Sequence, residues 1–116
     1  MRLPIQFALT YPERLANTLP QADFQRMALL QFEMPDHDRF PALRLAREAG
    51  ERGGTTPAVF NAANEVAVDR FIQGTIRFPQ IWGTVERVLS AHRTVEHAPL
   101  ETILEADHWA RAEAAR

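Results

Sequence analysis

The most continuous apolar pattern of this chain lies between residues 55 and 74, where apolar side chains point in almost every direction around a helical axis. Four of them form one helical stripe and four more widen it: Phe60, Ala63, Ala67 and Phe71, then Val59, Ala62, Val66 and Ile72. A threonine followed by Pro57 at the expected first helical position is typical of a helix start, and Gly74 of a helix end. A helix that is apolar nearly all round is surrounded by protein, so we predict a buried central helix.

A strip of polar residues interrupts this apolar pattern. Its members are spaced by three or four positions and therefore share one helix face: Asn61, Asn64, Glu65 and Asp69. Amides and carboxylates on a buried element need hydrogen-bond partners. Two interpretations follow: the strip bonds to a neighbouring loop or to water, or it contacts another domain or supports an active site. For the second we single out Asn61, Asn64 and Glu65 as a candidate interdomain contact.

Helical periodicity also occurs on both sides of the central helix. Before it, a helix is predicted that ends at Gly50 and the pair Gly53-Gly54. Five residues form its apolar face: Ala42, Leu43, Leu45, Ala46 and Ala49. After it, six residues recur at intervals of three and four: Phe78, Ile81, Trp82, Val85, Val88 and Leu89. In the tail we expect Leu100, Ile103 and Leu104 to pack inward. Two alternatives stay open there, a second short helix capped by Asp107 and carrying Trp109, or one continuous helix.

The first part of the chain does not share this pattern. A short helix is predicted to begin near Pro4 and to end before Pro12, and Leu30, Phe32 and Met34 alternate with polar residues as in a half-buried extended segment. Neither has a partner nearby in the sequence. We therefore predict a mainly α fold, in which a bundle of about four helices (residues 39–116) follows an irregular linker segment with a short helix and a short extended segment (residues 1–38).

Composition excludes several classes of function. The chain has 116 residues, enough for one core, with 46% hydrophobic and 24% charged residues and a net charge of −2. This charge, without a basic tract, excludes nucleic-acid binding through a phosphate-neutralising patch. The absence of cysteine and lysine excludes disulfides, thiolate ligands and Schiff-base chemistry. We expect no membrane partner and a cytoplasmic location, because neither a long apolar run nor a signal-peptide pattern is present.

Candidate catalytic chemistry is sparse. The run Asp36-His37-Asp38 contains metal-binding side chains, but neighbouring residues in a turn seldom converge on one ion, so we expect these carboxylates to cap the next helix. Ser90 has no histidine and carboxylate beside it, and we expect His92 and His97 to be solvated. The glycines near residue 53 match neither a Walker motif nor a dinucleotide fingerprint. We therefore assign no catalytic, cofactor-binding or metal-binding residue.

Four stretches of the sequence nevertheless resemble a known family. They are residues 1–6, 8–12, 35–41 and, most specifically, 57–68 with the order Asn-Ala-Ala-Asn-Glu-Val-Ala-Val. The chain resembles, over its whole length, the C-terminal part of 1-deoxy-D-xylulose 5-phosphate reductoisomerase. That family converts 1-deoxy-D-xylulose 5-phosphate to 2-C-methyl-D-erythritol 4-phosphate in non-mevalonate isoprenoid biosynthesis, with NADPH and a divalent cation, Mg or Mn.

The resemblance implies that residues 1–38 are the end of the catalytic domain and a linker, and that residues 39–116 are the C-terminal helical domain. The family's glycine-rich nucleotide loop, metal-binding carboxylates and phosphate-binding residues lie upstream of the matched part. Only Met1 matches a family position close to the nicotinamide, and no catalytic residue is carried over. We expect a fragment that supports the enzyme's structure but is inactive alone, with the missing domains of the same enzyme as partners and a homodimer as the full-length form. The alternative is a free-standing helical protein-interaction module without catalytic activity.

Overall fold

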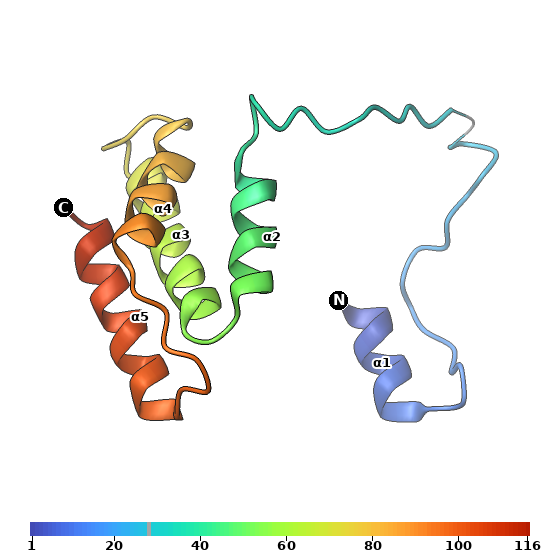
Figure 1. Ribbon diagram of the computed structural model, residues 1–116. Helices are drawn as coiled ribbons and strands as arrows, with labels where there is room; N and C mark the ends of the chain where they lie inside the picture. Colours follow the sequence, from blue (N-terminus) through green and yellow to red (C-terminus); the bar gives the residue numbers. More distant parts are fainter. Residues whose placement is uncertain (28) are drawn as a thin grey trace. The chain divides into compact units, whose positions relative to one another are not determined.

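The computed structural model describes residues 1–27 and 29–116, and it divides the chain into two compact units, Met1–Glu33 and Met34–Arg116 (Figure 1). Five α-helices occur in the described residues, and no strand does: α1 Arg2–Thr10, α2 Ala42–Arg52, α3 Thr56–Ile72, α4 Gln80–Ala91 and α5 Leu100–Ala114. The predicted mainly α fold, with a bundle of four helices after a short helix, is confirmed. Within the described residues, no helix is long and apolar enough to cross a membrane.

The α3 helix is the centre of the second unit and packs against α2, α4 and α5 (Figure 1). The buried core consists mainly of side chains from these four helices: Leu45, Val59, Ala62, Ala63, Val85, Val88, Leu89, Ala110 and Ala114. The prediction of a central helix is therefore confirmed. The prediction that it is buried nearly all round is wrong, because Phe71 and Ile72 are exposed. Three neighbouring helices leave one side of α3 open to solvent, and Asn61, Glu65 and Asp69 lie exposed on it.

The α2 helix buries a narrower face than its sequence predicts. Leu45 and Ala49, one turn apart, are buried, whereas Leu43 is 54% exposed and Ala42 and Ala46 are also exposed. The helix continues through Gly50, so the prediction that Gly50 terminates it is wrong. It ends at Arg52, and Gly53 and Gly54 follow with φ of 66° and 54°. This left-handed backbone, which favours glycine, turns the chain sharply into α3.

The α3 helix ends where the sequence predicts, but it begins one residue earlier than predicted, at Thr56, and its start is built differently. Thr55 is at the N-cap position with helical backbone angles, φ −79° and ψ −10°, and makes no side-chain capping bond. A capping residue normally has extended angles, which aim its oxygen at the first free N–H groups. Because α3 begins at Thr56, Pro57 is the second residue of the helix. At the other end Gly74 has φ of 72°, and its N–H donates to the carbonyl of Phe71 at 2.9 Å, which confirms the predicted glycine terminus.

The α4 helix buries the predicted stripe in part. Val85, Val88 and Leu89 are buried, and Ile81 and Trp82 are half-buried. Trp82 packs against the core, as predicted. Phe78 is exposed and stands edge-on between two other aromatic rings, 5.6 Å from Phe71 and 5.2 Å from Trp82 between ring centroids.

The α5 helix is continuous through Asp107 and Trp109, so the second of the two alternatives is correct. Asp107 does not cap a helix but accepts hydrogen bonds from Arg111, one turn later. Leu100 and Leu104 are 64% and 52% exposed, and the prediction that they pack inward is wrong. The helix instead contacts the core with its C-terminal half, where two small residues, Ala110 and Ala114, are completely buried.

The first unit contains the predicted short helix, α1, but none of the residues of α1 is buried. Leu30, Phe32 and Met34 belong to no helix or strand and are exposed, so the prediction that this segment is half-buried is wrong. Ala28 lies outside the described residues. Asp36 does not cap α2: its Oδ1 accepts hydrogen bonds from the N–H groups of Asp38 and Arg39, at 3.1 and 3.0 Å, within the preceding turn.

Candidate interdomain surface

The open side of α3 brings together two of the three predicted contact residues. The Asn61 Nδ2 donates to Oε1 of Glu65 at 3.0 Å, because residues four apart are neighbours on a helix surface. Both side chains are exposed, so their polar atoms reach solvent and do not need a buried partner. Their role as an interdomain contact stays a prediction.

Glu65 is also connected to α5 through Arg111. The Nη2 of Arg111 donates to Oε2 of Glu65 at 2.8 Å, and its Nε donates to Oδ2 of Asp107 at 2.8 Å. The hydrogen bond from Arg111, followed by that from Asn61, lowers the pKa of Glu65, and the hydrogen bond with Asp107 is the main reason that the pKa of Arg111 is raised. The network links α3 to α5 within the bundle. Because it is largely exposed, it positions side chains more than it stabilises the fold.

Asn64 faces a different environment from Asn61 and Glu65. It is half-buried and borders a cavity of about 20 Å³, only large enough for one water molecule, with apolar walls that include Phe60, Ile81 and Trp82. Among the described residues its amide makes no side-chain hydrogen bond. An unpaired amide beside aromatic rings is available to a partner that approaches this edge of α3.

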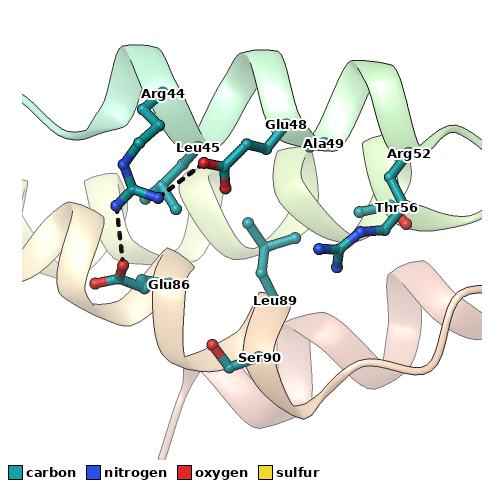
Figure 2. Close-up of a pocket in the computed structure, with 9 residues that line it drawn as sticks. All are labelled: Arg44, Leu45, Glu48, Ala49, Arg52, Thr56, Glu86, Leu89 and Ser90. Atoms are coloured by element: carbon teal, nitrogen blue, oxygen red, sulfur yellow. Dashed lines mark hydrogen bonds and ion pairs between the residues drawn. The ribbon is translucent and has the colours of Figure 1, made fainter. Parts of the chain in front are cut away.

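A second hollow lies between α2 and α4 (Figure 2). Its volume is about 190 Å³, and its lining combines charged and apolar side chains: Arg44, Leu45, Glu48, Ala49, Arg52, Thr56, Glu86, Leu89 and Ser90. Figure 2 shows the guanidinium of Arg44 reaching Glu48, at 2.9 Å, and Glu86, at 3.2 Å. The charge of Arg44 is thereby compensated inside the bundle, so the groove is better explained as an α2–α4 contact than as an anion site.

Two features of the described residues bear on whether this part of the chain could hold a metal ion or a dinucleotide. No group of three or more histidine, cysteine, aspartate or glutamate side chains in the described ranges could hold a metal ion. Gly54 is not free to cradle a phosphate, because a β-carbon at this position would collide with the carbonyl oxygen of Val95. These side chains therefore do not fit a divalent cation or a dinucleotide, and we derive no chemical step through either group.

The structure also brings together a set of residues that sequence reasoning missed. His92, which the sequence predicts to be solvated, is half-buried, and its Nε2 lies 2.8 Å from the hydroxyl of Thr55. The hydroxyl of Thr56 is 2.8 Å from that of Thr94. These contacts join residues 37 or 38 positions apart. In the sequence, the one feature that points to this site is the pair of adjacent threonines before Pro57.

Comparison with known proteins decides the family. The family described as DXP reductoisomerase C-terminal domain matches residues 1–113 of the chain. The chain belongs to this family. Similar sequences named 1-deoxy-D-xylulose 5-phosphate reductoisomerase include one from Desulforamulus reducens, 54% identical over 98% of the chain, and one from a Synechococcus species, 48% identical over 100%.

A solved structure supports the same assignment. The reductoisomerase of Zymomonas mobilis, in complex with NADPH, is 40% identical and superimposes over 98% of the chain with a TM-score of 0.86. The resemblance inferred from residues 57–68 is confirmed. The chain spans about 30% of the length of these relatives. As a DXP reductoisomerase C-terminal domain, it therefore corresponds to one part of a larger enzyme in the related proteins.

Proposed function

We propose that this chain works as the C-terminal helical domain of an NADPH-dependent 1-deoxy-D-xylulose 5-phosphate reductoisomerase in isoprenoid biosynthesis. Its role is to support the rest of the enzyme, and by itself it is inactive. The observation that carries the proposal is the family match over residues 1–113, together with relatives of which the chain spans about 30%. The complete enzyme we propose is a cytoplasmic homodimer that uses NADPH and Mg or Mn, bound outside this chain.

Two surfaces support the bracing role. In the first unit, large apolar side chains are exposed along α1 and the segment after it, such as Leu9 at 82% and Phe32 at 87%. Many large apolar side chains exposed within one short unit are typical of a surface that contacts another protein surface. On the bundle, Asn64 has a half-buried amide without a side-chain hydrogen bond among the described residues, and Asn61 and Glu65 lie exposed on the open side of α3. We propose these two surfaces as the contacts with the catalytic domain.

The experiment that tests the proposal is a domain exchange. The part of the Desulforamulus reducens reductoisomerase that matches this chain is replaced by the chain, and NADPH oxidation is followed with 1-deoxy-D-xylulose 5-phosphate and Mg²⁺ or Mn²⁺. We expect turnover by the hybrid, and none by the chain alone or by the relative truncated at the same point.

Turnover by the chain alone would contradict the proposed inactivity. A hybrid that is folded but no more active than the truncated relative would contradict the supporting role. That result would instead favour the alternative of an independent interaction module.

A further inference from the structure

The start of α3 carries the two buried polar residues of the described chain, Thr55 and Thr56, both completely inaccessible to solvent. A buried hydroxyl costs free energy unless it is hydrogen-bonded. Both hydroxyls find their partners in the segment between α4 and α5, at His92, Thr94 and Val95. The N–H of Thr55 also donates to the carbonyl of Val95 at 3.2 Å. Side-chain and backbone bonds therefore fasten this segment to the start of α3.

The hydrogen-bond donors and acceptors around Thr55 indicate which ring nitrogen of His92 carries the hydrogen. A threonine hydroxyl has one hydrogen to donate. The N–H of Val95 donates to the Thr55 oxygen at 3.1 Å, so this oxygen is already an acceptor. The hydroxyl hydrogen then needs an acceptor of its own, and among the described residues this is Nε2 of His92, at 2.8 Å. The imidazole consequently carries its hydrogen on Nδ1 and leaves Nε2 unprotonated.

The groups around the imidazole also favour its neutral form. The side chain is half-buried, and its ring lies 5.4 Å from the ring of Trp109 on α5. Burial, followed by the positive charge of Arg52 at the end of α2, lowers the pKa of His92. The neighbour from α3 is the uncharged hydroxyl of Thr55, and that from α5 is the uncharged indole. Of the described charged groups, Arg52 is the one that acts on the imidazole.

We propose that His92 is a pH-sensitive latch between the start of α3 and the segment of residues 92–99. When the imidazole is neutral, it accepts the Thr55 hydroxyl hydrogen and holds this segment in place. When Nε2 takes up a proton, its N–H faces the Thr55 O–H, and the buried hydroxyl loses its acceptor. The hydrogen bonds of Thr55 with Val95 then lose their support, and the segment opens.

The direction of the pH effect follows from the lowered pKa. The unfolded chain protonates His92 near the ordinary value of about 6.5. The folded chain does so at lower pH, so between these values the unfolded state binds more protons. The contribution of the latch to the free energy of unfolding is therefore complete above the pKa of His92 in the unfolded chain. It is lost as the pH falls from there towards the pKa of His92 in the folded chain.

Nuclear magnetic resonance of the labelled full chain tests the proton assignment directly. We expect the ¹⁵N shifts of His92 to show a hydrogen on Nδ1 at neutral pH, and its titration midpoint to lie below about 6.5. A hydrogen on Nε2, or a midpoint at or above that value, would overturn the proposal. This measurement needs no variant and does not depend on whether a mutant folds.

Hydrogen exchange tests the opening of the segment. Between about pH 7 and about pH 5, we expect the protection factors of the Thr55 and Val95 amides to fall more than those of core amides in α3. In His92→Gln, whose amide oxygen accepts the Thr55 hydrogen without titrating, this selective loss should disappear. In His108→Gln, which changes an exposed histidine on α5, it should persist. Equal behaviour of the two variants would refute the latch.

Discussion

Alanine supplies many of the completely buried side chains of the bundle. Ala62, Ala63 and Ala67 on α3, with Ala110 and Ala114 on α5, are all completely buried. Such small side chains allow helix backbones to approach closely, and a larger residue would have no room in a densely packed core. The core volume then depends on a few larger apolar residues, among them Leu45 and Val59. Each of these should contribute strongly to stability.

Two leucines on α2 allow a matched test of this dependence. Leu45 is 4% exposed and Leu43 is 54% exposed, although both lie on the apolar face predicted from the sequence. We expect Leu45→Ala to lower the free energy of unfolding by about 3 kcal/mol, because it removes buried methyl groups and leaves a cavity. Leu43→Ala should change it by less than about 1 kcal/mol. Urea unfolding followed by tryptophan fluorescence measures both, and equal losses would contradict the packing described.

At the scale of elements, the most constrained part of the bundle is the junction between the α2–α3 turn and the α4–α5 segment. Gly53 and Gly54 both have left-handed backbone, but only Gly54 lies directly against another segment, at Val95. Gly50, by contrast, lies inside α2, and nothing lies within 4 Å of the place where its β-carbon would be. The three glycines therefore occupy three different physical environments within five residues.

Alanine substitution should separate these environments. We expect Gly54→Ala to cost more than about 3 kcal/mol, because it adds a backbone collision to the strain of a positive φ, and Gly53→Ala about 2 kcal/mol from the strain alone. Gly50→Ala should stabilise the chain by about 0.5 kcal/mol or more, since alanine favours a helix interior. Thermal unfolding followed by circular dichroism measures all three. A smaller loss for Gly54→Ala than for Gly53→Ala would show that the contact with Val95 is not tight.

At the scale of the whole molecule, the two units differ in how they bury apolar surface. The second unit has a core of its own, whereas the buried hydrophobic residues of the described chain include none from the first unit. Folding is driven mainly by apolar burial, so the first unit gains little stability from its own contacts. This contrast agrees with the proposed role, in which the first unit lies against other parts of a larger enzyme.

Replacing the two asparagines of α3 tests the proposed interdomain contact. In the hybrid enzyme, we expect Asn61→Leu and Asn64→Leu to lower turnover, because leucine removes the amide that a partner would bond. The isolated chain should still fold, since Asn61 is exposed and Asn64 only half-buried. Gln73→Leu, an exposed amide at the end of α3, serves as the control and should leave turnover unchanged. Full activity of both asparagine variants would show that neither amide contributes to the interdomain contact.

Much of the fold follows from local pattern. Helical spacing, Pro57 and Gly74 located α3, and the stripe from Ile81 to Leu89 located α4, because backbone geometry and side-chain spacing act over a few residues. The order of residues 57–68 was also enough to indicate the family. The errors concern exposure, as at Leu43 and Leu104, since an apolar residue is buried only where another element covers it.

The sequence alone determined which segments are helical and to which family the chain belongs. Only the tertiary structure decided which face of each helix is covered, that Glu65 bonds to Arg111, and that Thr55 meets His92. These contacts join residues 46 and 37 positions apart. They depend on how helices pack and on which hydroxyl hydrogen finds an acceptor, and neither property is set by the spacing of residues along one segment of the chain.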